Sequence, residues 1–139
     1  MAITSTANAE WKGALKEGSG HVTFGTFAGD YTFAGRFETG KGTNPEELLA
    51  AAHASCFSMQ LSGLLTANKT PPTAIHTSAK VTIQAGEGIT KSILHVTAEV
   101  PGIDQAKLTE LAEQAKDICP VSKALAGIKE IAVHAKLKH

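Results

Sequence analysis

The sequence of 139 residues is long enough for one domain with a hydrophobic core. Hydrophobic residues make up 42% of it, and 13 basic side chains balance 13 acidic ones, so the formal net charge is zero. This balance excludes the strong positive charge that is typical of proteins that bind nucleic acids or anionic membranes.

Two cysteines, Cys56 and Cys119, are the most reactive side chains of the sequence. The N-terminal residues lack the apolar segment of a signal peptide, and no run approaches a transmembrane span. We therefore expect a cytoplasmic protein without a membrane segment. Structural disulfides are rare in that reducing compartment, so the cysteines are either two separate buried thiols or a transient catalytic pair.

The first part of the chain predicts three antiparallel strands, with the sequences AEWKGAL, HVTFGTF and YTFAGRF. The segments KEGSG and AGD contain glycine and predict the turns between them. The segment TGKGT then connects this meander to the first helix.

A long helix is predicted from Pro45 to about Ala67. Asn44 is a suitable N-cap, Pro45 suits the first helical position, and Glu47 stands where a capping box has its glutamate. The helix is apolar on nearly all sides, which predicts burial all round. Because one small sheet cannot cover such a helix, we expect a homodimer.

The remaining sequence predicts two strands, two helices and a final strand. In chain order they are expected in residues 73–88, 89–100, 105–118, 121–127 and 129–139. Asp104 is a suitable N-cap, and Cys119-Pro120 separates the two helices. The predicted order is β-β-β-α-β-β-α-α-β, an α+β fold in one domain over residues 1–139, with antiparallel sheets packed around the long central helix.

Cys56 lies about three turns into the long helix, too far for the helix dipole to lower its pKa. Lowering the thiol pKa by about two units takes roughly 2.7 kcal/mol of preferential stabilisation of the thiolate. A guanidinium group is a suitable source, and Arg36 is the only arginine among the 13 basic residues. To point at a sulfur atom Arg36 needs a carboxylate that holds it, and Glu46 or Glu47 is expected to do so.

The spacing of these residues places a limit on the arrangement. Glu46 and Cys56 are ten residues apart, which is about 15 Å along a helix. A line from Glu46 through Arg36 to Cys56 within one chain would therefore be stretched. Two such helices that cross antiparallel in a dimer would bring Glu46 of one chain near Cys56 of the other, so we expect an active site at the subunit interface.

Cys119 precedes Pro120 at a predicted helix start, where free backbone N–H groups can stabilise a thiolate. If Cys119 reaches Cys56, a sulfenic acid on Cys56 can condense with it to a disulfide. The two cysteines are more than sixty residues apart, so the spacing by itself predicts nothing about their distance.

His53 stands one turn before Cys56, so a Cys–His pair for acyl hydrolysis is conceivable. A packed or hydrogen-bonded helix histidine is the favoured interpretation, because no third group is visible. The remaining histidines have no metal-ligand spacing, and the glycine-rich segments lack the pattern of a phosphate-binding or dinucleotide-binding loop. No metal or cofactor is therefore expected.

The sequence GRFETGKGTNPEELLAAAHASCFSMQL resembles the signature of the OsmC/Ohr family of organic hydroperoxide reductases. DICPVSKAL resembles the second-cysteine motif of that family, and IAVHAKL its closing strand, so the resemblance extends along nearly the whole chain. It implies an intertwined α+β homodimer that reduces organic hydroperoxides with two cysteines and without metal or haem. It also implies a dithiol reductant, for which the family commonly uses lipoyl groups.

The resemblance implies roles for four residues. Cys56 matches the peroxidatic cysteine, Cys119 the resolving cysteine, Arg36 the catalytic arginine and Glu46 the catalytic glutamate. The position of Arg36 shortly before the long helix is similar to that in the OsmC branch of the family. The small residues around Cys56 would leave room for the organic tail of a peroxide.

Two other functions stay open at this point. A dimer of this fold could bind a ligand or sense oxidation without efficient turnover, and a Cys–His acyl hydrolase is the less favoured alternative. Turnover of an organic hydroperoxide with a dithiol would argue against the first. Ester hydrolysis that survives Cys119→Ser would support the second.

Overall fold

The computed structural model describes residues 1–37 and 42–139, which form two compact units, Met1–Leu48 and Leu49–His139. Residues 38–41, which include most of the predicted TGKGT connection, lie outside the described residues. The described residues contain two three-stranded sheets and four helices, so the predicted α+β class is confirmed. The single domain over residues 1–139 stays a prediction.

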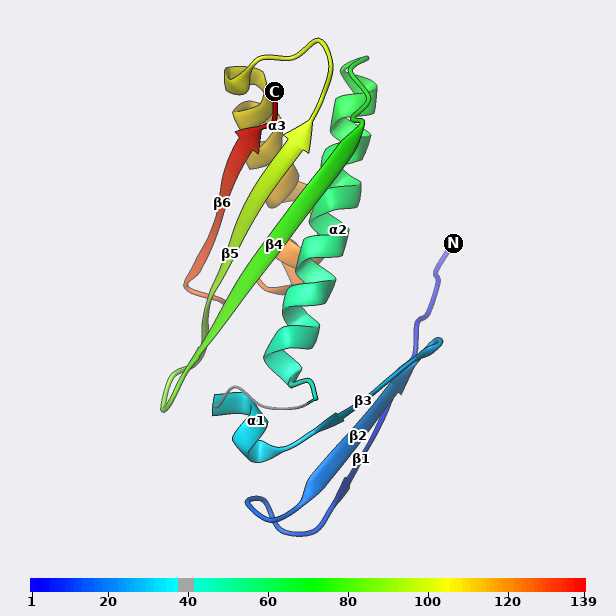
Figure 1. Ribbon diagram of the computed structural model, residues 1–139, viewed down its shortest axis with the longest axis vertical. Helices are drawn as coiled ribbons and strands as arrows, with labels where there is room; N and C mark the ends of the chain where they lie inside the picture. The colour runs from blue at the N-terminus through cyan, green and yellow to red at the C-terminus, as the bar shows by residue number, and fades with distance from the viewer. Residues whose placement is uncertain (38–41) are drawn as a thin grey trace. The chain divides into compact units, whose positions relative to one another are not determined.

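The first unit contains an antiparallel sheet with the strand order β1-β2-β3 and a short helix (Figure 1). The elements are β1 (Asn8–Lys12), β2 (Ser19–Phe24), β3 (Phe27–Tyr31) and α1 (Phe33–Phe37). The meander is confirmed, but the predicted AGD turn is wrong. The strands β2 and β3 join through Gly25 and Thr26 instead, because Gly25 takes a φ of 56° at the first position of a two-residue hairpin loop, where glycine is favoured.

The second half of YTFAGRF is the helix α1, so the strand predicted for this segment is wrong there. Two local interactions favour the helix. The Gly35 N–H donates to Thr32 Oγ1 over 3.0 Å, as at a capped helix start. The rings of Phe33 and Phe37, one turn apart, meet edge to face with their centroids 5.3 Å apart. As a consequence Arg36 lies in the last turn of a helix.

The second unit contains most of α2 and a sheet with the order β4-β5-β6 (Figure 1). The elements are α2 (Pro45–Ala67), β4 (Ala74–Gln84), β5 (Gly88–Glu99), α3 (Gln105–Ile118), α4 (Pro120–Ala124) and β6 (Glu130–Leu137). The predicted order is confirmed apart from the additional α1. The predicted antiparallel sheet is wrong in one pair, since β6 runs parallel to β5. The chain reaches β6 through α3 and α4, a crossover long enough to bring a strand back in the same direction.

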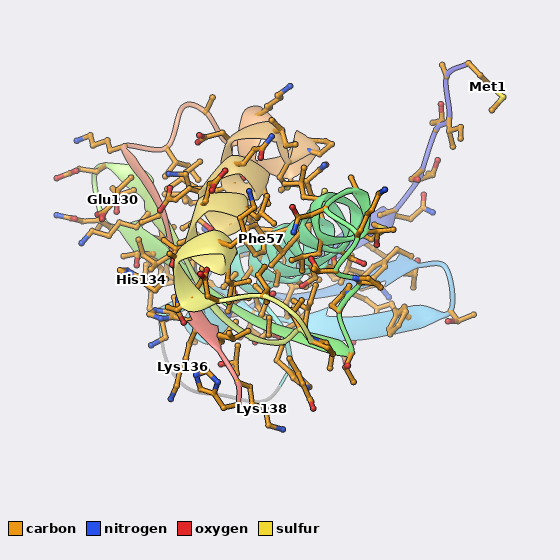
Figure 2. All side chains as sticks on the ribbon, turned by 90° about the horizontal axis from the view of Figure 1, so that it is seen from above. Met1, Phe57, Glu130, His134, Lys136 and Lys138 are labelled. Atoms are coloured by element: carbon orange, nitrogen blue, oxygen red, sulfur yellow. The ribbon has the colours of Figure 1, made fainter. Side chains whose placement is uncertain are left out.

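The core of the second unit lies between this sheet and the helices α2 and α3. Phe57, Leu61 and Leu65 are fully buried and share one face of α2 at helical spacing. They belong to one cluster with Leu94 of β5, and Figure 2 shows Phe57 in this layer. The cluster fixes the part of α2 on which Cys56 lies.

The opposite side of α2 is exposed in the single chain. Met59 is 73% exposed, and Ala51, Ala52 and Ser55 are exposed as well. Among the helices that the structure describes, α2 has the length and composition of a membrane span, which the sequence analysis did not expect. Core helices of soluble proteins meet the same criteria, and the face with Phe57 is packed in a protein core.

Candidate functional site

Arg36 and Glu46 form an ion pair within the first unit. Arg36 Nε lies 3.0 Å from Glu46 Oε1, between the last turn of α1 and the first turn of α2. Glu47 has a different place, because its N–H donates to Asn44 Oδ1 (2.7 Å) and its carboxylate accepts from Thr43 Oγ1 (2.8 Å). Asn44 is therefore the predicted N-cap, and Glu46 is the carboxylate that holds the guanidinium.

The Arg36–Glu46 ion pair does not provide a hydrogen-bond partner for every polar atom of the two side chains. The Glu46 side chain is 9% exposed, and its Oε2 atom is buried without a hydrogen-bond partner among the described residues. Arg36 uses Nε in this contact, which leaves the terminal nitrogens of the planar fork for a further acceptor. Because a buried carboxylate oxygen without a donor costs free energy, we interpret the pair as a polar site that a further group completes.

Arg36 is one of the residues that line an apolar cavity in the first unit. Its volume is about 190 Å³, and a dry cavity of roughly 150 Å³ is known to hold a benzene molecule. The residues that line it are Trp11, Leu15, Tyr31, Thr32, Phe33, Arg36 and Pro45. An aromatic pocket with one permanent charge suits a ligand that has an apolar body and one polar group.

Cys56 and Cys119 are neighbours in the second unit. Cys56 is half-buried on α2, and Cys119 is fully buried at the junction of α3 and α4. Both are free thiols, and Cys56 packs against the buried cluster that contains Cys119, close enough for Cys119 and the Val121 backbone N–H to shift the pKa of the Cys56 thiol. The sequence left open two separate buried thiols or a transient catalytic pair. The structure places the two cysteines next to each other, and their catalytic role stays a prediction.

The surroundings of Cys56 in its own unit raise the pKa of its thiol. Burial is the main cause, because it disfavours the thiolate, and the hydrogen bond and charge of Cys119 act in the same direction. The Val121 N–H donated to the sulfur lowers the pKa and opposes them. The cationic activation predicted for Cys56 is therefore not supplied by the residues of its own unit.

His53 is fully buried on α2 and bonded at both ring nitrogens. Its Nδ1 lies 2.6 Å from Ser92 Oγ on β5, and its Nε2 lies 2.8 Å from Ser122 Oγ on α4. Burial lowers the pKa of His53, so the ring is neutral at physiological pH. With both nitrogens engaged by serines, His53 has no free lone pair to take a proton from Cys56, which argues against the Cys–His hydrolase.

Neither serine is predicted from the sequence as a partner of His53. One signal was available for Ser92, which occupies an inward-facing position of β5 where the neighbours Leu94 and Val96 are apolar. A buried hydroxyl at such a position predicts a polar partner in the core. Across residues 1–37 and 42–139, no group of three or more metal-binding side chains is found.

The buried, neutral His53 makes stability depend on pH. Its pKa is lower in the folded chain than in the unfolded chain, where it is about 6.5, so between the two values the unfolded chain binds more protons. The free energy of unfolding should therefore be fully retained above about pH 6.5 and fall below it, by up to about 1.4 kcal/mol per pH unit. Urea unfolding of the wild type and of His53→Gln at several pH values measures this slope. Parallel pH profiles for the two proteins would contradict it.

Comparisons with known proteins show which family this sequence is similar to. The sequence matches the family described as OsmC-like protein over residues 38–134. It is 43% identical over 146 residues to Peroxiredoxin OsmC of Escherichia coli (strain K12), with 99% of each chain covered. It is 34% identical over 89 residues to an Organic hydroperoxide resistance protein of Xanthomonas axonopodis pv. citri (strain 306), with 63% of each chain covered.

Solved structures show the same fold. The OsmC like protein from Mycoplasma pneumoniae has a TM-score of 0.77 at 19% identity, with 100% of both chains covered. The Organic Hydroperoxide Resistance Protein OhrB of Bacillus subtilis has a TM-score of 0.63 at 27% identity, with 96% of this chain and 98% of that chain covered. At 19% identity the first likeness concerns the fold alone.

Proposed function

Because the chain belongs to the OsmC-like protein family, we propose that it is a thiol peroxidase that reduces organic hydroperoxides to alcohols. The names of its relatives, peroxiredoxin and organic hydroperoxide resistance protein, support a peroxide-reducing oxidoreductase. The observation that carries the proposal is that Cys56 packs against the core cluster that contains Cys119, close enough for Cys119 to raise the pKa of the Cys56 thiol. Two neighbouring free thiols, one half-buried and one fully buried, suit a cycle in which the first is oxidised and the second resolves it.

In the proposed cycle the Cys56 thiolate attacks one oxygen of the hydroperoxide. An S–O bond forms, the O–O bond breaks, and the alkoxide leaves as an alcohol after it takes up a proton, so Cys56 becomes a sulfenic acid. The Cys119 sulfur then attacks the Cys56 sulfur, and the hydroxyl group leaves as water while the disulfide forms. A dithiol reductant then reduces the disulfide by thiol–disulfide exchange, is itself oxidised to a disulfide, and restores both cysteine thiols.

In this proposal Arg36 and Glu46 activate Cys56 across a dimer interface. The support is that Cys56 lacks an activating cation in its own unit, whereas Arg36 is held by Glu46 and has donors left over. Glu46 lies about 15 Å along α2 from Cys56. The exposed side of α2, with Met59, is the face that a second copy would cover. The chain is thus proposed to act as an intertwined homodimer whose active site lies at the subunit interface.

The reductant and the location belong to the same proposal. A dithiol is required because a single Cys56–Cys119 disulfide has to be opened in each cycle, and lipoyl groups on proteins are the candidate that the family resemblance suggests. The proposed location is the reducing cytoplasm, where structural disulfides are rare and cysteine pairs are usually transient. Neither a metal nor a bound cofactor is needed for any step of the proposed cycle.

Organic hydroperoxides should be better substrates than hydrogen peroxide. Each buried methylene group contributes about 0.8 kcal/mol of binding free energy, so an apolar pocket should raise kcat/KM for alkyl or aryl hydroperoxides by about one to three orders of magnitude. Initial rates with cumene hydroperoxide, tert-butyl hydroperoxide and hydrogen peroxide, at a fixed concentration of a dithiol, test this proposal. The Cys56→Ser protein provides the background rate. A preference for hydrogen peroxide would contradict the apolar pocket.

One observation favours a second candidate, a sensor that is oxidised without efficient turnover. The raised pKa of Cys56 in its own unit predicts a slow reaction with peroxide if no second copy supplies a cation. The same assay separates the candidates, because a sensor consumes peroxide once and then stops even with excess dithiol.

A further inference from the structure

His53 joins three elements of the second unit, although no step of the proposed cycle uses it. The fully buried imidazole lies on α2 and is bonded to Ser92 on β5 and to Ser122 on α4. Buried polar groups that are satisfied on all sides specify one arrangement of their partners, because any other arrangement leaves a buried donor or acceptor unpaired. The His53 network therefore holds α4 in one place relative to α2 and β5.

The helix α4 depends on such contacts for its position. It has five residues, far fewer than a helix needs to be stable by itself, and it follows directly on Cys119. Two of its residues interact with α2: Ser122 is bonded to His53, and the Val121 N–H lies near enough to the Cys56 sulfur to lower the pKa of the thiol. His53 and Cys56 are three residues apart, so they lie on neighbouring turns of the same side of α2. They form two attachment points for the segment that carries Cys119.

We propose that His53 is a positioning residue for the disulfide step: through Ser122 it holds α4, and with it Cys119, against Cys56. This proposal rests on the proposed peroxidase function, since it concerns the same two cysteines. In the step itself the Cys119 thiolate attacks the sulfenic sulfur of Cys56, the S–S bond forms, the S–O bond breaks, and the hydroxide takes up a proton and leaves as water. A disulfide needs a narrow range of distances and dihedral angles, so a fixed α4 keeps Cys119 close to the reactive geometry.

If a substitution releases α4, the formation of the disulfide should be slowed more than the reaction of Cys56 with peroxide. Cys56 still reacts with peroxide, because that step does not use the Cys119 sulfur, although the loss of the Val121 N–H, which lowers the pKa of Cys56, should slow this step as well. Cys119 then meets the sulfenic acid less often, the sulfenic acid lives longer, and a second peroxide molecule oxidises it to the irreversible sulfinic acid. A mere loss of stability would instead lower the fraction of active protein in both steps to the same extent.

The two serines provide a matched pair of variants. Ser92 and Ser122 are both buried, at 0% and 6% exposure, and each is bonded to His53, but only Ser122 lies on α4. Reduced protein is mixed with cumene hydroperoxide, quenched with a reagent that traps sulfenic acids, and analysed by mass spectrometry over time. We expect Ser122→Ala to slow disulfide formation about tenfold or more and to raise the sulfinic acid yield, while Ser92→Ala changes the disulfide rate by less than about threefold. Equal effects of the two variants, or no effect of Ser122→Ala, would overturn the proposal.

A second experiment measures the attack of Cys119 on Cys56 without peroxide. A dithiodipyridine converts the Cys56 thiol to a mixed disulfide, and attack by Cys119 releases a second thiopyridone, whose absorbance gives the rate of the intramolecular step. Ser122→Ala and His53→Gln should slow this second release, and Ser92→Ala should not. If the wild type does not reduce peroxides but the Ser122→Ala effect persists here, the peroxidase proposal fails and the positioning role of His53 stands. If the three variants and the wild type release thiopyridone at one rate, His53 has no positioning role.

Discussion

Replacement of Cys56 by serine should abolish peroxide reduction down to the uncatalysed background, because a serine hydroxyl cannot form a sulfenic acid. Replacement of Cys119 should have a different result. Cys119→Ser keeps the thiol that meets the peroxide, so about one equivalent of hydroperoxide per chain should disappear before the reaction stalls or slows. Peroxide consumption in a single turnover, measured with both variants and the wild type, gives the comparison.

Each variant is the experimental control for the other, because each removes one of the two sulfur atoms. The Cys56→Ser protein retains the buried thiol, and the Cys119→Ser protein retains the half-buried one. A sulfenic acid should be detected by mass spectrometry on Cys56 in the Cys119→Ser protein. The assignment of the peroxidatic cysteine would be wrong if Cys56→Ser consumed peroxide in a single turnover as the wild type does.

Mixing two inactive variants should restore activity. An Arg36→Ala chain keeps Cys56, and a Cys56→Ser chain keeps Arg36 with its partner Glu46. If Arg36 of one chain activates Cys56 of the other, one of the two sites in a mixed dimer is intact. About half of the wild-type activity per dimer should then return, whereas each variant by itself stays nearly inactive. The measurement is the peroxidase rate of mixed dimers purified with two different affinity tags.

The matched control for the mixed dimer is a pair of variants placed on one chain. A double variant Arg36→Ala with Cys56→Ser, mixed with the wild type, also leaves two intact and two altered side chains. In the shared-site arrangement each of its sites lacks one group, so this dimer should be nearly inactive. Nearly half activity in this control, and none in the first mixture, would mean that Arg36 and Cys56 act within one chain.

Most helices and strands could be predicted from interactions between residues that are close in the sequence. Asn44 and Pro45 predict the start of α2, and Asp104 predicts the start of α3. Each of these signals acts within one turn of its own helix, where a side chain caps the N–H groups that the helix leaves free. The structure differs from the predicted elements where several local preferences compete. YTFAGRF contains residues that favour a strand, but a threonine cap and a pair of phenylalanines one turn apart stabilise α1 in its second half.

The residue types of the candidate site were likewise visible in the sequence. The sequence contains two cysteines and a single arginine, with a glutamate at a predicted helix start. This combination is unusual enough to identify them as candidate site residues from the sequence alone. The sequence by itself left open which glutamate holds Arg36, and only the family resemblance favoured Glu46. The structure decides by geometry, since Glu47 is taken up by the cap of α2 and Glu46 faces the guanidinium.

Contacts between distant residues were decided by the tertiary structure alone. Cys56 and Cys119 meet because α2 and α3 pack on one face of the same sheet, and no property of the intervening residues encodes that distance. The partners of His53 are a second case, since Ser92 and Ser122 lie on different elements and nothing in the sequence connects either of them with His53. Caps and periodicity are set by atoms within a few residues of each other, whereas side chains far apart in the sequence meet only when the whole core has closed.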